Sequence, residues 1–229
     1  MRAACALAAG HGSTLDCGVL LPRPARIAVL ASGNGSNFEV LASAARGGML
    51  GGSIVALFSD QPGAFALERA SRLGIESRVL PVGRFRSRLE DERPWLDALR
   101  ERAVDVVLLA GFMRRLHAPL LSAYAGRILN IHPSLLPSFP GLDAMGRAWR
   151  HGVRVTGCTV HVVEDAVDGG PIVAQRAVEV REDDTLDTLE CRIHAAEHAL
   201  YPEAVRRFLC EPWMLDGRRL EFGTREARA

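Results

Sequence analysis

The alternation of short apolar segments with helical patterns between Arg26 and Pro133 limits the fold more than any other feature of this chain. We predict strands in five segments: 26–32, 53–60, 75–82, 104–112 and 127–133. The first is a β-branched run typical of a buried strand, and the fourth is a continuous apolar run. Apolar residues recur at helical spacing in the segments between the predicted strands: 38–48, 63–74, 94–104 and 119–124. This alternation is typical of α/β proteins, so we predict a mostly parallel sheet with helices on both faces.

The second half of the chain has a different pattern. Segments 155–163 and 170–180 are predicted strands, and the short connection between them has no helical periodicity. They predict an antiparallel C-terminal extension of the sheet, followed by a helix over 184–208 that Pro202 is expected to bend or break. We expect a single domain over 26–210, with residues 1–25 as a flexible N-terminal extension and 211–229 as a C-terminal tail.

The composition argues against several classes of function. Of the 229 residues, 48% are apolar and 24% are charged, and the net charge of +1 gives no strong attraction for nucleic acid or an anionic membrane. The absence of lysine excludes Schiff-base chemistry and a Walker-type phosphate loop. The five cysteines form no C-x-x-C pair, so we expect reduced thiols in the cytoplasm and no zinc site. No apolar run approaches the ~20 residues of a membrane span.

A glycine-rich turn, "SGNGSN" at 32–37, connects the first predicted strand to the first predicted helix. Such a turn presents backbone N–H groups and the positive end of a helix dipole, which together bind anions. Phe38 stands where the dinucleotide fingerprint has its third glycine, so a single phosphate fits better than NAD. An ordinary tight turn between strand and helix is the alternative, and the turn by itself favours neither.

Asn130 and His132, in "NIHPS", lie two residues apart on a predicted strand, so their side chains point to the same side. Ligands bind at the carboxyl ends of strands in open parallel sheets. An amide donor beside an imidazole suits a reaction that builds negative charge on a carbonyl oxygen. The alternative is a structural histidine whose ring nitrogens form hydrogen bonds with nearby backbone groups. The asparagine partner and the position at the end of the strand favour a catalytic pair instead. Prolines 133, 137 and 140 are expected to stiffen the exit from this strand.

Two further segments each leave two interpretations open. Asp168, in "VDGGPI", is either a plain turn residue or a carboxylate brought to His132, where it would favour the imidazolium. The loop "AGFMRRL" at 110–116 holds an apolar pair, Phe112 and Met113, beside two arginines. It is either a core-and-surface loop or the wall of a pocket for a flat aromatic ligand with an acidic tail.

The blocks "SGNGSN", "LAGFMRRL", "NIHPSLLPSFPGLDA", "VTGCTVH" and "VDGGPI", in this order, resemble those of the folate-dependent phosphoribosylglycinamide formyltransferase family. The similarity extends from about Arg26 to Phe208 and implies a Rossmann-like formyltransferase fold. It implies transfer of a formyl group from 10-formyltetrahydrofolate to the primary amine of 5-phosphoribosylglycinamide, in de novo purine (IMP) biosynthesis. It also implies small-molecule partners only, with no metal, nucleic acid or membrane, and a monomer or homodimer in the cytoplasm.

The resemblance further implies roles for individual residues. Its catalytic residues fall on Asn130, His132 and Asp168. Its contacts with the phosphorylated acceptor fall on Gly35, Ser36, Asn37 and Glu197. Its contacts with the formyl-folate fall on Arg88, Met113, Arg114, Arg115, Leu116 and Asn130, with residues 165–168 forming a loop around the folate.

Three other functions share part of this pattern. Formyltetrahydrofolate deformylase transfers the formyl group to water, but it usually carries an N-terminal regulatory domain, for which residues 1–25 are too few. Methionyl-tRNA formyltransferase shares "SLLP" but needs a C-terminal RNA-binding domain, whereas only residues 209–229 follow the last helix and the charge is near neutral. A nucleotide-binding module without catalysis would keep "GNGSN" but would not need Asn130, His132 and Asp168 together.

Overall fold

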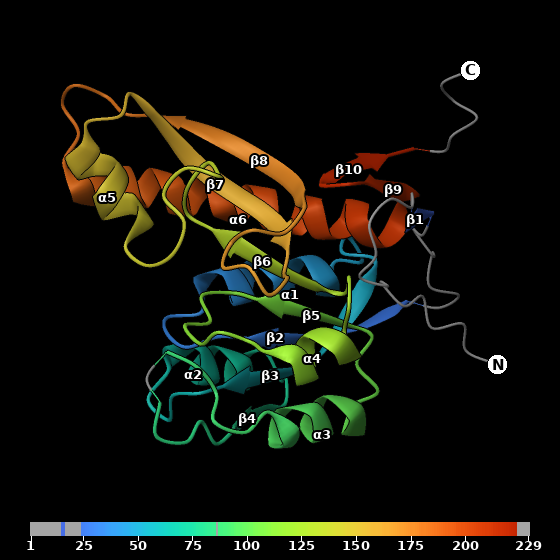
Figure 1. Ribbon diagram of the computed structural model, residues 1–229. Coiled ribbons are helices and arrows are strands. Elements are labelled where there is room, and N and C mark those ends of the chain that lie inside the picture. The colour runs from blue at the N-terminus through green and yellow to red at the C-terminus, as the bar shows by residue number, and fades with distance from the viewer. Residues whose placement is uncertain (1–14, 17–23, 86, 224–229) are drawn as a thin grey trace.

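The computed structural model describes residues 15–16, 24–85 and 87–223 (Figure 1). The strands are β1 Leu15–Asp16, β2 Ala25–Leu30, β3 Gly52–Ser59, β4 Ser77–Val79, β5 Val106–Leu109, β6 Ile128–His132, β7 Val155–Val162, β8 Ile172–Glu179, β9 Trp213–Asp216 and β10 Arg219–Phe222. The helices are α1 Ser36–Arg46, α2 Phe65–Arg72, α3 Arg93–Glu101, α4 Ala118–Ala123, α5 Ala144–His151 and α6 Leu186–Cys210. Most of the N-terminal extension predicted over 1–25 lies outside the described residues.

One sheet connects all of these strands, in the order β1-β9-β10-β8-β7-β6-β5-β2-β3-β4. Strands β4, β3, β2, β5 and β6 are parallel to one another, whereas β7 and β8 continue the sheet in antiparallel orientation. The prediction of a mostly parallel sheet with an antiparallel C-terminal extension is therefore confirmed. Strand β6 is the border, because it runs parallel to β5 and antiparallel to β7 (Figure 1).

Helices cover both faces of the sheet, and the side chains of β2 alternate between the two cores that result. Ile27 and Val29 pack in the core formed with α1, α2 and α6. Ala28 and Leu30 pack in the core formed with α3 and α4. Because both faces of the strand are buried, its sequence is a continuous apolar run rather than an alternating one.

Pro202 was predicted to bend or break the last helix, and the break does not occur, because α6 continues through this residue. Packing on both sides of the proline explains the continuity, since Tyr201 and Val205 are fully buried. The hydroxyl oxygen of Tyr201 lies 3.0 Å from the carbonyl oxygens of both Leu109 and Leu129. These contacts fasten the helix to β5 and β6 and outweigh the hydrogen bond that a proline removes from a helix.

Two regions contain elements that the sequence patterns did not predict. Helix α5 follows the proline-rich loop, and Gly146 in its interior weakens the helical pattern. Strands β9 and β10 lie within the predicted tail 211–229, where they form a hairpin that pairs with β1 and β8. The rings of Phe208 and Trp213 stack with their centroids 4.8 Å apart, which joins this hairpin to the end of α6.

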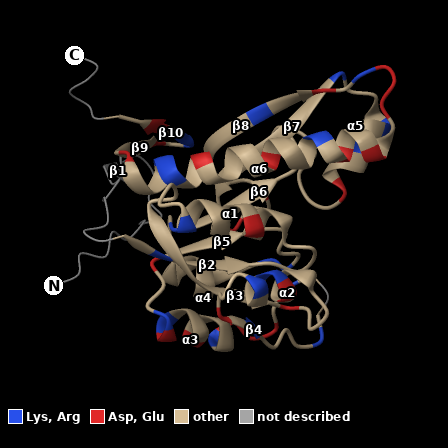
Figure 2. Ribbon diagram, turned by 180° about the vertical axis from the view of Figure 1, so that it is seen from behind, with Lys and Arg blue, Asp and Glu red and all other residues tan. Residues whose placement is uncertain are grey.

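Charges of both signs are distributed over the outer surfaces of the helices (Figure 2). This distribution accords with a net charge of +1 and leaves no single-sign field across the helical faces that the figure shows. Within the described ranges, no helix combines the length and the apolar character that a bilayer span requires.

Candidate active site

Strand β6 places Asn130 and His132 at the border between the parallel and antiparallel parts of the sheet. His132 is the last residue of the strand and is only 6% exposed, whereas Asn130 is partly exposed. Both side chains contact residues that belong to β7 or to the loop that follows it. The predicted pair therefore lies at the carboxyl end of a central strand, as the sequence pattern requires.

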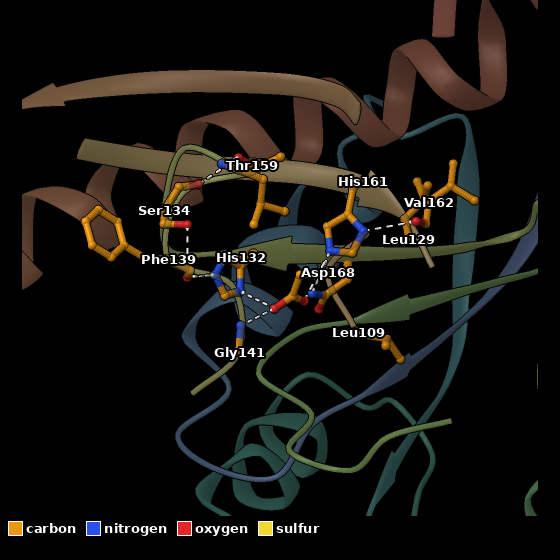
Figure 3. Close-up of polar contacts among 12 residues, drawn as sticks. Leu109, Leu129, His132, Ser134, Phe139, Gly141, Thr159, His161, Val162 and Asp168 are labelled. Carbon is orange, nitrogen blue, oxygen red and sulfur yellow. Dashed lines mark hydrogen bonds and ion pairs between the residues drawn. The ribbon is translucent and has the colours of Figure 1, made fainter. Parts of the chain in front are cut away.

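Both ring nitrogens of His132 face oxygen atoms (Figure 3). Nδ1 lies 3.4 Å from Oδ2 of Asp168, and Nε2 lies 3.0 Å from the carbonyl oxygen of Phe139. Because a carbonyl oxygen only accepts, Nε2 donates to it, and a doubly protonated ring also donates from Nδ1 to the carboxylate. The structure thus brings Asp168 to His132 and places an oxygen acceptor at each ring nitrogen.

The tight loop between β7 and β8 holds Asp168, whose φ is 49°. Oδ2 accepts a hydrogen bond from the backbone N–H of Gly141 at 2.7 Å, and Oδ1 lies 3.6 Å from Nε2 of His161. Burial raises the pKa of Asp168, but the contacts with His161 and Gly141 and the charge of His132 outweigh burial and hold this pKa below its usual value. The carboxylate is therefore ionised at neutral pH.

His161 is a fourth member of this group, and the sequence analysis did not single it out. It lies on β7 directly opposite Asn130 in the antiparallel register. Its Nδ1 donates to the carbonyl oxygen of Val162 at 3.0 Å, and its Nε2 lies 3.1 Å from the side-chain amide of Asn130 and 3.6 Å from Oδ1 of Asp168. The histidine of "VTGCTVH" was visible in the sequence, but only the pairing of β6 with β7 shows that it faces Asn130. We call Asn130, His132, His161 and Asp168 the strand-end cluster.

Side chains of the antiparallel strands hold the proline-rich loop that follows β6. Thr159 Oγ1 donates to the carbonyl oxygen of Ser134 at 2.7 Å and accepts from the N–H of Leu136 at 3.0 Å. Gln175 Nε2 donates to the carbonyl oxygen of Leu136 at 2.9 Å. Hydrogen bonds from β7 and β8 thus add to the stiffness that the prolines of this loop confer.

The glycine-rich turn begins α1 beside α2. Gly35 has a φ of 76° and directly precedes Ser36, the first residue of α1. A Cβ at Gly35 would lie 2.6 Å from Cβ of Ala66, so both the backbone conformation and the close approach require glycine. Asn37 Nδ2 donates to Oε2 of Glu197 at 3.0 Å. Two residues that the resemblance assigns to the acceptor therefore meet, although they lie far apart in the sequence.

Glu197 is a carboxylate on α6 with only 3% of its surface exposed. Besides Asn37, Nδ1 of His194 lies 3.0 Å from the same Oε2. This hydrogen bond raises the pKa of His194, so a proton on the imidazole helps to balance the buried negative charge. Burial, with a further contribution from the charge of Glu197, raises the pKa of Cys158 to about 12, so this thiol remains neutral. We call Asn37, His194 and Glu197 the helix cluster.

The residues that the resemblance assigns to the folate divide between open and buried positions. Met113 is 59% exposed, and its N–H donates to Ser32 Oγ at 2.8 Å, which joins this loop to the glycine-rich turn. The side chain of Arg114 is mostly buried, with Nε 2.7 Å from Oδ2 of Asp60. Leu116 is buried in the core formed with α3 and α4. Arg114 and Leu116 therefore support the loop from inside, whereas Met113 faces solvent.

Arg88 and Arg115 lie beside one another on a short parallel bridge between their backbones. The guanidinium of Arg115 also donates to the carbonyl oxygen of Asp165 at 2.8 Å. The structure therefore brings together the segment around Arg88 and the loops 113–116 and 165–168, which are the three segments that the resemblance assigns to the folate.

The surface has two open hollows, one beside the loop of Met113 and one between the proline-rich loop and α5. The first has a volume of about 640 Å³ and lies between the glycine-rich turn, the beginning of α2 and the loop after β5. It is lined by Ser32, Gly33, Asn34, Gln61, Gly63, Ala64, Phe65 and Met113. The other, of about 610 Å³, is lined by Ser138, Phe139, Arg147, Arg150 and His151.

In the part of the chain that the structure describes, no group of three or more His, Cys, Asp or Glu side chains is arranged to hold a metal ion.

Comparisons with known proteins show which proteins this chain is similar to. The family model described as formyl transferase matches residues 25–205, a range that contains every residue of both clusters. Phosphoribosylglycinamide formyltransferase of Bacillus subtilis (strain 168) is 45% identical over 184 residues, which cover 80% of this chain and 94% of that protein. The enzyme of the same name from Escherichia coli (strain K12) is 42% identical over 192 residues, which cover 84% of this chain and 88% of that protein. The crystal structure of glycinamide ribonucleotide transformylase 1 from Symbiobacterium toebii has a TM-score of 0.83 and 44% identity, and covers 87% of this chain and 94% of that one.

Proposed function

The chain belongs to the formyl transferase family, and on that premise we propose that it is a phosphoribosylglycinamide formyltransferase of de novo purine (IMP) biosynthesis. It transfers the formyl group of 10-formyltetrahydrofolate to the primary amine of 5-phosphoribosylglycinamide. The products are N-formylglycinamide ribonucleotide and tetrahydrofolate. Its partners are these small molecules, and it acts in the cytoplasm as a monomer or homodimer.

The strand-end cluster is the observation that carries this proposal. An amide, two imidazoles and an ionised carboxylate converge at the border of the sheet, in contacts of 3.1, 3.4 and 3.6 Å. Such a group can donate hydrogen bonds to a developing oxyanion and can move a proton nearby, which are the two tasks of acyl transfer to an amine.

The glycine-rich turn and the helix cluster are proposed to bind the acceptor. Gly35, Ser36 and Asn37 form the beginning of α1, where backbone N–H groups and the helix dipole suit a phosphate. Glu197 is a buried carboxylate that accepts from Asn37, and it offers further acceptor capacity to ribose hydroxyl groups or to the amine of the acceptor.

The loops around Arg88, Met113–Leu116 and 165–168 are proposed to bind the formyl-folate. The exposed side chains of Met113 and Val167 belong to two of these loops, and they offer apolar surface to a flat ring. Arg115 provides a cation at the same loops, and Arg88 lies beside it for an acidic tail. Arg114 and Leu116 act from beneath the loop, because the first is paired with Asp60 and the second is buried.

The proposed reaction begins when the acceptor amine attacks the formyl carbon and forms a new C–N bond. Asn130 and protonated His132 stabilise the tetrahedral oxyanion that results. Asp168 places a negative charge beside His132 and, through water, helps to move a proton from the attacking nitrogen to the leaving nitrogen of the folate. The bond between the carbon and the folate nitrogen then breaks, and the oxyanion returns to a carbonyl.

A single absorbance assay tests this function. The purified protein is mixed with 10-formyltetrahydrofolate, with and without 5-phosphoribosylglycinamide, and the loss of the formyl-folate is followed. Loss that depends on the acceptor is the expected result. Loss without the acceptor would identify a deformylase, and no loss in either case would favour a binding module without catalysis.

A further inference from the structure

The turn Phe139–Gly141 contacts both members of the His132–Asp168 pair (Figure 3). The carbonyl oxygen of Phe139 accepts from Nε2 of His132 at 3.0 Å, and the N–H of Gly141 donates to Asp168 Oδ2 at 2.7 Å. Phe139 and Gly141 have φ values of 53° and 79°, and this conformation is unfavourable for phenylalanine. The orientation of the His132–Asp168 pair therefore depends on a turn that its surroundings must hold in place.

Helix α5 holds the middle of this turn. Nη1 of Arg147 donates to the carbonyl oxygen of Pro140, the residue between the two catalytic contacts. The guanidinium carbon of Arg147 also lies 5.9 Å from the centroid of the Phe139 ring. His151, one turn later on α5, meets the same ring edge-on, with the centroids 5.7 Å apart. Arg147 and His151 thus hold the backbone and the ring of the turn from one side of α5.

We propose that Arg147 is a positioning residue for formyl transfer, because it fixes the Phe139–Gly141 turn and, through that turn, the orientation of His132 and Asp168. The inference rests on the proposed function of the strand-end cluster. A hydrogen bond from a guanidinium to a carbonyl oxygen is charge-assisted and therefore stronger than a neutral one. It acts on the peptide unit between Pro140 and Gly141, whose N–H contacts Asp168, and the carbonyl that contacts His132 belongs to the peptide unit directly before it. We therefore expect its loss to shift both contacts.

Two variants of Arg147 separate positioning from a general effect on the fold. Arg147→Met keeps most of the aliphatic stem but removes the donor, whereas Arg147→Lys keeps a charged donor. We expect kcat of Arg147→Met to fall about 3- to 10-fold, with both KM values near those of the wild type, because only the geometry of the reacting groups changes. Arg147→Lys should recover most of this loss. Thermal unfolding of each variant shows whether the fold is intact.

Arg150→Met is the matched control, since Arg150 lies on the same helix, lines the same hollow and pairs with Asp143 instead of the turn. Its kcat should equal that of the wild type. An unchanged kcat in Arg147→Met, an equal loss in Arg150→Met, or no recovery in Arg147→Lys would each overturn the positioning role. A wild-type protein without acceptor-dependent transfer would refute the proposed function as well, whereas an active wild type that is insensitive to Arg147→Met would refute the positioning role alone.

Discussion

The strand-end cluster and the helix cluster each contain a carboxylate beside an imidazole, but they are built differently. In the strand-end cluster, Asp168 lies in a loop with a φ of 49°, and its oxygens are 3.4 and 3.6 Å from the imidazoles of His132 and His161. In the helix cluster, Glu197 lies on a long helix, and its Oε2 is 3.0 Å from both Asn37 and His194. The contacts between carboxylate and imidazole are therefore long in the first cluster, whose carboxylate lies in a strained loop, and short in the second, whose carboxylate lies on a packed helix.

This difference accords with the two proposed tasks. Hydrogen bonds among catalytic groups are often long before the substrate binds and shorten in the reacting complex, so the distances around Asp168 suit a site that closes on its substrates. A binding site gains affinity when its groups are already in place, which suits the rigid position of Glu197. The comparison predicts that changes in the strand-end cluster reduce kcat, and that changes in the helix cluster raise the KM for the acceptor.

The largest effect is expected at the two proposed oxyanion donors. Loss of one such donor typically lowers kcat by ~10²–10³, so Asn130→Ala and His132→Ala should each lose at least this much activity. The measurement is kcat of the purified variants at saturating concentrations of both substrates. Turnover near that of the wild type in either variant would remove that residue from the oxyanion role.

Asp168→Asn is expected to have the next largest effect. The pKa of Asp168 is lower than usual, so the wild-type carboxylate remains charged through the neutral range, and it lies 3.4 Å from Nδ1 of His132. The amide carries no negative charge, so kcat should fall about 10²-fold or more and the pH–rate profile should change. Kinetics measured across a pH series check both outcomes.

A matched control for Asp168 is Asp187→Asn, which removes a negative charge from an exposed position at the beginning of α6. Its profile should coincide with that of the wild type. If Asp168→Asn also kept the wild-type profile, Asp168 would be only a turn residue. The difference between Asp168 and Glu197 would then not be a difference between catalysis and binding.

Glu197→Gln tests whether the helix cluster binds the acceptor. The amide retains the size of the side chain but loses the charge and one acceptor, so the KM for the acceptor should rise about 10- to 100-fold, with a smaller change in kcat. Steady-state kinetics with varied acceptor at a fixed concentration of formyl-folate measure the change in KM and the change in kcat separately. Glu203→Gln, an exposed glutamate on the same helix that pairs with Arg176, should leave both constants unchanged. A loss confined to kcat would place Glu197 with the catalytic groups instead.

The sequence predicted the parts of this molecule that local patterns determine. Continuous apolar runs predicted the buried parallel strands, and the spacing of Asn130 and His132 placed both at one strand end. The position of His161 was not predictable in this way, because it depends on the register between β6 and β7, which no local pattern specifies. The burial of Arg114 against Asp60 likewise depends on a contact between residues distant in sequence.

The smallest expected effect concerns the pH dependence of stability in the helix cluster. The hydrogen bond with Glu197 raises the pKa of His194 above its unfolded value of about 6.5. The stabilisation is therefore fully present below that unfolded value and is lost as the pH rises through the folded pKa. Since the side chain of His194 is 46% exposed, we expect a contribution below about 1 kcal/mol after screening by solvent.

His194→Gln should therefore lower the free energy of unfolding more at about pH 5.5 than at about pH 9. Urea denaturation of both proteins at these two pH values measures the difference. In a Glu197→Gln background, the same substitution should lose its pH dependence, because the carboxylate partner is gone. A destabilisation that is equal at both pH values, or that persists in the double variant, would show that Glu197 does not hold the proton on His194. The helix cluster would then owe its short contacts to packing alone.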